Sequence, residues 1–139
     1  MTPHLHVLDT SVAIAWYLPE EFSQAAKIWQ ERLVQGKARF LVPPLHYIEF
    51  ANVIRTYVRR GEIKRDLAME IYQLHLETPL EVVAMPPEGI LQIALEYEAT
   101  AYDAAFIQLA LKQDAQLLTG ERTTTPWVVK LGKMAQVVK

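Results

Sequence analysis

Four acidic residues stand where a folded chain could bring them together. Asp9 directly follows a short apolar run, and Glu121 follows a second such run through Gly120. Glu49 lies in a mostly apolar stretch, and Asp103 precedes a run of small and apolar residues. Carboxylates gathered at one place are suitable ligands for a hard divalent cation, which can support hydrolysis of a phosphate ester.

Each acid also has a simpler structural explanation. An aspartate such as Asp9 or Asp103 at the start of a helix is a common cap or first-turn residue. Glu121 could be an exposed loop acid paired with Arg122. Glu49 is harder to explain in this way because its neighbours are mostly apolar and a partly buried glutamate needs a partner.

The four acids are more informative together than separately. Two of them end strands, and two lie early on helices that we expect to begin near the same sheet edge. Carboxylates gathered there would repel and raise each other's pKa values, and Mg²⁺ or Mn²⁺ would relieve that repulsion. The pattern indicates metal-assisted hydrolysis of a phosphodiester. The predicted metal ligands and catalytic residues are Asp9, Glu49, Asp103 and Glu121.

The elements that must position these acids alternate between strand and helix. Strands are expected at 4–8, 39–42, 80–85, 116–119 and 134–138. Helices are expected at 12–18, 22–35, 45–60, 66–78, 88–98, 103–113 and 126–131, the first of them capped by Thr10 or Ser11. This alternation is typical of parallel βαβ units and an α/β sheet covered on both faces. Ligands bind such sheets at the carboxyl edge of the strands.

Composition sets the class of protein. The chain has 139 residues, of which 51% are hydrophobic, so we expect a single domain over 1–139 with a real core. It lacks an apolar run of membrane-spanning length, a signal-like start and any cysteine, so we expect a cytoplasmic protein without disulfides or Cys-ligated zinc. The formal net charge of −2 means that nucleic-acid binding would need a local basic patch.

Four segments of the chain resemble, in order, the motifs of PIN-domain nucleases. The segments are Val7-Leu8-Asp9-Thr10-Ser11, Glu49 after Pro43-Pro44, Thr100-Ala101-Tyr102-Asp103-Ala104-Ala105-Phe106, and Leu117-Leu118-Thr119-Gly120-Glu121. In size the chain is most similar to VapC-type toxins. The family usually has aspartate two residues after the threonine of the last motif. This chain has Glu121, which is one methylene longer and still an acid.

The resemblance implies a fold, an activity and partners. The fold would be a three-layer α/β/α arrangement around a central, mainly parallel sheet of four to five strands. The activity would be that of a Mg²⁺- or Mn²⁺-dependent endoribonuclease, leaving a 5′-phosphate and a 3′-hydroxyl on its RNA substrate. The partners would be a second copy in a homodimer and a cognate antitoxin that blocks the site.

Several polar residues are candidates for supporting roles around the acids. Thr10, Ser11 and Thr119 could hydrogen-bond the carboxylates, although capping explains them equally simply. Asn52 could lean into the site from the helix face of Glu49, or bond local backbone.

Basic residues offer two candidate contacts for RNA phosphates. Arg122 stands beside a proposed ligand and is the favoured RNA-binding residue. For a second group of basic residues we favour a solvated charged face. That group comprises Arg55, Arg59, Arg60, Lys64 and Arg65.

Two other functions fit parts of the pattern. A PIN scaffold without catalysis could bind RNA or a regulatory partner, with Glu121 as a sign of lost activity. A phosphatase of the haloacid-dehalogenase type could use Asp9 as a nucleophile, but Ser11 stands where that family has a second acid.

Overall fold

The computed structural model describes residues 4–139, and at its centre lies a parallel sheet of five strands. The strands are β1 (His4–Leu8), β2 (Ala38–Val42), β3 (Glu81–Val82), β4 (Gln116–Thr119) and β5 (Ala135–Val137). Their order across the sheet is β3-β2-β1-β4-β5, so β1 is the central strand. Because neighbours are all parallel, the strands end at one common edge.

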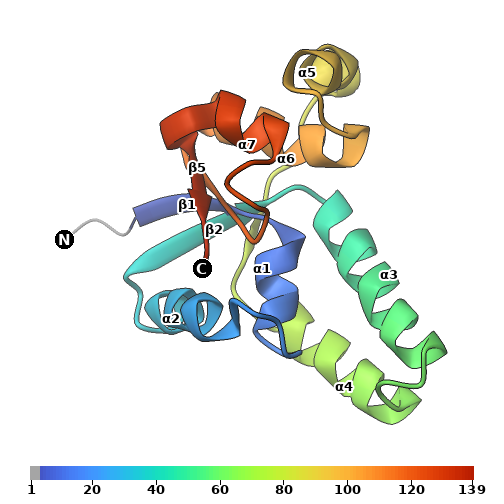
Figure 1. Ribbon diagram of the computed structural model, residues 1–139. Helices are drawn as coiled ribbons and strands as arrows, with labels where there is room; N and C mark the ends of the chain where they lie inside the picture. Colours follow the sequence, from blue (N-terminus) through green and yellow to red (C-terminus); the bar gives the residue numbers. More distant parts are fainter. Residues whose placement is uncertain (1–3) are drawn as a thin grey trace.

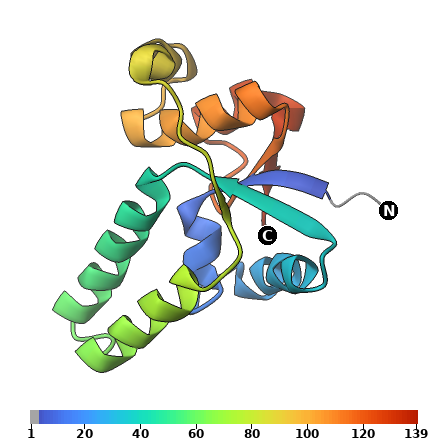
Figure 2. The ribbon, with the colours of Figure 1, turned by 180° about the vertical axis from the view of Figure 1, so that it is seen from behind.

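Helices cover both faces of this sheet (Figures 1 and 2). One face carries α1 (Thr10–Ala15), α2 (Ser23–Val34), α3 (Leu45–Arg59) and α4 (Arg65–Leu76). The other carries α5 (Ile90–Tyr97), α6 (Ala101–Gln113) and α7 (Pro126–Leu131), with short 3₁₀ turns at Pro87–Gly89 and Gly132–Met134. The predicted three-layer α/β/α fold is confirmed. Across residues 4–139, none of the helices has both the length and the apolar character needed to cross a bilayer.

The sheet divides the core into two hydrophobic clusters because successive strand residues point to opposite faces. In β1, Leu8 packs with the α1–α4 side and Val7 with the α6–α7 side. In β4, Leu118 packs with the α1–α4 side and Leu117 with the α6–α7 side. All four side chains are at most 1% exposed, so β1 and β4 are buried on both faces. Their carboxyl ends are therefore held in a rigid part of the molecule.

Two of the predicted elements differ from the structure by three residues at one end. The strand predicted at 80–85 is reduced to Glu81–Val82, because it lies at the edge of the sheet and the strand it pairs with, β2, ends at Val42, where the chain turns away through Pro43-Pro44. Helix α1 begins at Thr10 and ends at Ala15, earlier than the predicted 12–18. The predicted cap by Thr10 or Ser11 is wrong, because Asp9 takes the N-cap position, although its side chain makes no capping hydrogen bond.

The core of α6 can be tested by comparing two aromatic residues on that helix. Phe106 is 1% exposed in the cluster beneath α6 and α7, whereas Tyr102 is 62% exposed. We expect Phe106→Ala to lower the free energy of unfolding by about 3–5 kcal/mol through lost burial and the cavity left behind. Tyr102→Ala should change it by less than about 1 kcal/mol. Urea unfolding would measure both, and equal losses would contradict the packing described.

Candidate active site

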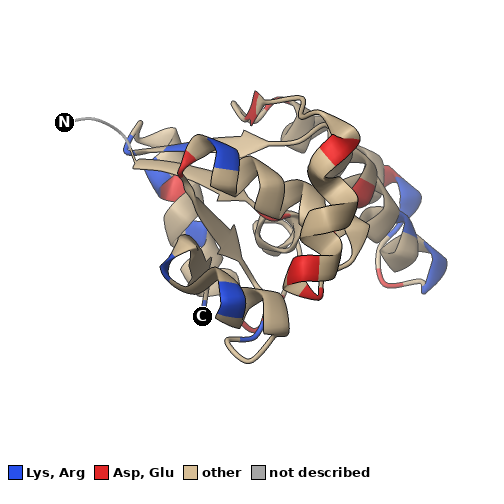
Figure 3. Cartoon of the chain, turned by 90° about the horizontal axis from the view of Figure 1, so that it is seen from above, with Lys and Arg blue, Asp and Glu red and all other residues tan. Residues whose placement is uncertain are grey.

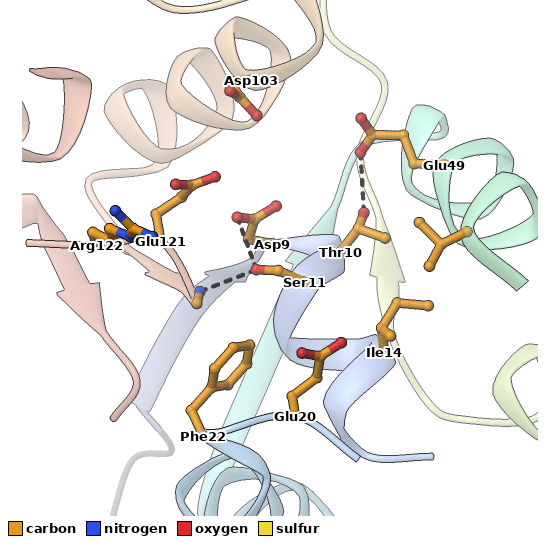
Figure 4. A pocket seen from close by; sticks show the side chains of 12 residues that line it. Asp9, Thr10, Ser11, Ile14, Glu20, Phe22, Glu49, Asp103, Glu121 and Arg122 are labelled. Carbon is orange, nitrogen blue, oxygen red and sulfur yellow. Dashed lines mark hydrogen bonds between the residues drawn. The ribbon is translucent and has the colours of Figure 1, made fainter. Parts of the chain in front are cut away.

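A pocket of about 460 Å³ opens at the carboxyl edge of the sheet. Its lining comprises Asp9, Thr10, Ser11, Ile14, Glu20, Phe22, Glu49, Val53, Asp103, Gly120, Glu121 and Arg122. All four acids singled out in the sequence are among them. In Figure 4, Asp9, Asp103 and Glu121 face a common space, and Glu49 approaches it from α3.

Asp9 is the most buried of these acids and is held by two hydroxyl groups. Strands β1 and β4 pair with Leu8 opposite Leu118, which brings the next residues, Asp9 and Thr119, side by side. Thr119 Oγ1 donates a hydrogen bond of 2.7 Å to Asp9 Oδ2, and Ser11 Oγ donates one of 3.2 Å to the same oxygen. No residue within 4–139 donates a hydrogen bond to Oδ1, which leaves that oxygen for a ligand.

Glu49 faces the pocket from the second turn of α3. Its side chain is half-buried, and Thr10 Oγ1 donates a hydrogen bond of 3.1 Å to Glu49 Oε1. Burial is the main reason that the pKa of Glu49 is raised, and the charge of Asp103 raises it further. The hydrogen bond from Thr10 opposes this shift.

Asp103 stands in the first turn of α6, where the positive end of the helix dipole favours an anion. Thr100 caps this helix, because its Oγ1 accepts a hydrogen bond of 3.0 Å from the Asp103 backbone N–H. Burial raises the pKa of the Asp103 carboxyl, and the charge of Glu121 adds to the rise. The charge of Glu121 therefore acts on Asp103 across the pocket.

The carboxylates impose an electrostatic cost on one another. Burial raises the pKa of Asp9 from 3.8 to about 7, and the charges of Asp103 and Glu49 push it in the same direction. The Thr119 and Ser11 hydrogen bonds offset only part of this rise. A bound cation would reverse the balance, since it favours the charged form of every carboxylate that faces it.

Glu121 stands in the exposed turn after β4. Its backbone N–H donates a hydrogen bond of 3.1 Å to Thr119 Oγ1, and Thr125 Oγ1 donates one of 3.3 Å to Glu121 Oε2. At the preceding Gly120, a Cβ would overlap the ring of Phe22, so any larger residue would have to displace that ring. The turn therefore directs the longer acid into the pocket that the other three acids line.

The donor set of this pocket suits a hard divalent cation. Four carboxylates offer only oxygen ligands, as Mg²⁺ and Mn²⁺ prefer. Within residues 4–139, no three acidic or histidine side chains stand close enough to hold an ion in their present rotamers. Glu49 and Glu121 line the pocket through side chains with several rotatable bonds, so their carboxylates are the ones most able to change position.

The predicted supporting residues are placed differently from one another. Thr10, Ser11 and Thr119 all donate hydrogen bonds to the acids, as described above. Asn52 is exposed and does not line the pocket. One residue further along α3, Val53 takes the position facing the pocket, because residues four apart share a helix face more closely than residues three apart.

The two basic groups also separate in space. Arg122 is exposed and lines the pocket beside Glu121. In the cartoon of Figure 3, several Lys and Arg positions gather where α3 connects to α4, at the right-hand end of the view. Arg55, Arg59 and Arg65 of this group line a separate groove between the two helices.

Among the lining residues that sequence reasoning did not assign to the pocket are two that follow α1, Glu20 and Phe22. Glu20 is a fifth acid there, and the Tyr57 hydroxyl donates a hydrogen bond of 3.1 Å to its Oε1. Phe22 directly precedes α2, lines the pocket and packs its ring against Gly120. Both lie in the loop after α1, because the helix predicted from residue 22 begins only at Ser23.

The raised pKa of Asp9 predicts how stability depends on pH in the metal-free protein. Because folded Asp9 holds its proton more tightly than the unfolded chain does, this contribution is complete below about pH 4 and is lost as pH rises through 7. In EDTA, the free energy of unfolding should fall between pH 5 and pH 8 by about 2–3 kcal/mol more in the unmodified protein than in Asp9→Asn. Urea unfolding at both pH values would measure the difference, and parallel pH profiles would contradict it.

Comparison with known proteins agrees with this geometry. The family model described as "PIN domain" matches residues 6–123, a span that contains all four acids. The chain is 32% identical over 120 residues to "Ribonuclease VapC3" of Pyrobaculum aerophilum, covering 84% of this chain and 88% of that protein.

Two crystal structures share the fold. The structure of PAE2754 from Pyrobaculum aerophilum matches with a TM-score of 0.73 and 20% identity, covering 99% of this chain and 91% of that one. The structure of VapBC2 from Rickettsia felis, bound to a DNA fragment from its promoter, matches with a TM-score of 0.66 and 12% identity, covering 97% and 99%. The resemblance seen in the four motifs is confirmed, and the chain belongs to the PIN domain family.

Proposed function

We propose that this protein is a Mg²⁺- or Mn²⁺-dependent endoribonuclease that hydrolyses RNA phosphodiester bonds. The observation that carries the proposal is the buried carboxylate of Asp9, which shares one pocket with Glu49, Asp103 and Glu121. Such a group of acids is unfavourable without a cation and has no evident structural purpose. The 32% identity to a protein named as a ribonuclease supports the same activity.

The four acids would hold the metal ion. When bound, the ion would supply an activated water molecule and neutralise charge on the phosphate that is cleaved. The protein's hydroxyl groups hold the acids in place: Thr119 and Ser11 orient Asp9, and Thr10 orients Glu49. Among the acids, Glu121 is the most exposed, so it is the one most able to adjust when substrate enters.

Arg122 is the side chain best placed to bind the RNA backbone. It is exposed and stands next to Glu121 on the rim of the pocket, within reach of a phosphate adjoining the cleaved bond. A guanidinium group pairs with phosphate through two parallel hydrogen bonds.

We extend the proposal to the biological setting that the relatives suggest. Residues 1–139 would act as one PIN-like domain in the cytoplasm, as the toxin of a VapC-type toxin–antitoxin pair. A cognate antitoxin would block the carboxylate pocket, and two copies of the chain would form a homodimer. The structural similarity to a VapBC complex supports a fold able to take part in such a pair.

Removal of one carboxylate should abolish cleavage without unfolding the protein. Asp103→Asn should cleave RNA about 100-fold more slowly or worse in Mn²⁺, because the neutral amide binds the cation weakly. Cleavage by the unmodified protein should disappear in EDTA and return with Mn²⁺. A gel assay on tRNA and rRNA would measure both effects.

Asp114→Asn is the matched control for that substitution. Asp114 is exposed at the C-terminal end of the same helix, in a left-handed conformation that asparagine also accepts. The Asp114→Asn variant should cleave RNA at the rate of the unmodified protein. Full activity of Asp103→Asn would refute the nuclease mechanism, and binding of RNA without cleavage by the unmodified protein would favour the non-catalytic scaffold.

The role of Arg122 can be separated from that of the α3–α4 basic group. Arg122→Ala should raise KM severalfold. It should also reduce the slope of log RNA affinity against log salt concentration by about 1, which corresponds to the loss of one phosphate contact. Arg59→Ala removes a similar exposed charge from the separate groove between α3 and α4 and should change neither quantity. Fluorescence anisotropy at several salt concentrations would measure affinity, and the reverse pattern would place the RNA on α3 and α4.

A further inference from the structure

A line of hydrogen-bonded side chains runs from the active-site pocket into the interior between α1, α3 and α4. Thr10 Oγ1 lies 3.1 Å from Glu49 Oε1 and 2.9 Å from His46 Nδ1. His46 Nε2 lies 2.7 Å from His75 Nε2, and His75 Nδ1 lies 3.0 Å from the Tyr17 hydroxyl. Each of the four ring nitrogens therefore has a polar partner.

The two histidines are fixed within the core. Both are 0% exposed, and the ring of His75 stacks on Phe50 with centroids 4.1 Å apart and an angle of 11° between planes. Burial lowers the pKa of His46 to about 3 and that of His75 to about 4, so both rings are neutral at pH 7. A neutral imidazole has one donor nitrogen and one acceptor nitrogen.

These constraints allow one direction for the protons when Glu49 is ionised. The carboxylate can only accept, so Thr10 donates its single hydroxyl hydrogen to Glu49 and must accept from His46 Nδ1–H. His46 Nε2 then lacks a proton and accepts from His75 Nε2–H. His75 Nδ1 in turn accepts from the Tyr17 hydroxyl, so every hydrogen in the line points toward Glu49.

We propose that His46 and His75 are positioning residues of the active site, which hold the Thr10 hydroxyl in the orientation that directs its hydrogen to Glu49. This inference rests on the proposed nuclease function of the Glu49 pocket. The simpler role for such histidines is to satisfy each other in the core. That role does not require a particular tautomer, whereas orientation of Thr10 requires His46 to carry its proton on Nδ1.

The tautomers can be measured independently of any activity. Long-range ¹H–¹⁵N correlation spectra of the unmodified protein should show His46 protonated on Nδ1 and His75 protonated on Nε2 at about pH 7. Spectra of single-histidine variants would assign the signals. Observation of His46 protonated on Nε2 would overturn the proposal whether or not the protein is a nuclease.

Substitution of His46 tests whether the orientation matters for cleavage. His46→Leu should lower kcat by roughly tenfold, the usual effect of losing a partner of a metal-binding carboxylate. His46→Asn should recover most of the rate, because its amide N–H stands close to the position of Nδ1–H and can still donate to Thr10. His75→Phe, which retains the stacking on Phe50, should release the tautomer of His46 and lower kcat similarly.

His6→Phe is the matched control, since His6 is also buried but packs against Trp29 away from the pocket. It should leave kcat unchanged. Thermal unfolding would verify that each variant is folded. If His46→Leu does not fold, the positioning role still predicts that His46→Asn cleaves faster than His75→Phe, and equal rates would contradict it.

The outcomes separate the two proposals. Variants of His46 and His75 that cleave at the unmodified rate would refute the positioning role while the nuclease function stands. An unmodified protein that has the expected tautomers but does not cleave RNA in Mn²⁺ would refute both proposals, because no reaction would then be left for the histidines to assist.

Discussion

The burial of the Asp9 carboxylate beside other acids is the constraint on which the rest of the site depends. Burial and the neighbouring charges of Asp103 and Glu49 raise its pKa to about 7, so the ionised form is unfavourable in the protein alone. The fold nevertheless holds this side chain in place through Thr119 and Ser11. This conflict supports the proposal that the pocket binds a cation, which would turn mutual repulsion into shared attraction.

The architecture explains how acids far apart in the chain meet. A parallel sheet ends all its strands at one edge, and the central position of β1 places Asp9 at the middle of that edge. The carboxyl end of β4 adds Thr119 and Glu121, the start of α6 adds Asp103 with a favourable helix dipole, and α3 adds Glu49. Buried side chains on both faces of β1 and β4 make this edge rigid, so the flexible part of the site is confined to the longer acids.

The sequence predicted the parts of the molecule that follow from local patterns. Alternating apolar runs predicted the α/β/α layers, and the four acids within or beside those runs were predicted to meet where the pocket lies. The length of β3 depends instead on where its neighbour β2 ends. On α3, the helical geometry places Val53 rather than Asn52 toward the pocket. The contacts of His46 with Thr10 and His75 join three helices, so no local pattern could reveal them, although His46 lies one helix turn before Glu49.

The central claim is that these acids form a cation site, and Mn²⁺ binding tests it most directly. Electron paramagnetic resonance of free Mn²⁺, titrated with the purified protein at neutral pH, measures binding without reference to any substrate. The account predicts that the unmodified protein binds Mn²⁺ and that Asp9→Asn weakens this binding by about tenfold or more. Equal binding by both proteins, or no binding by the unmodified protein, would contradict it.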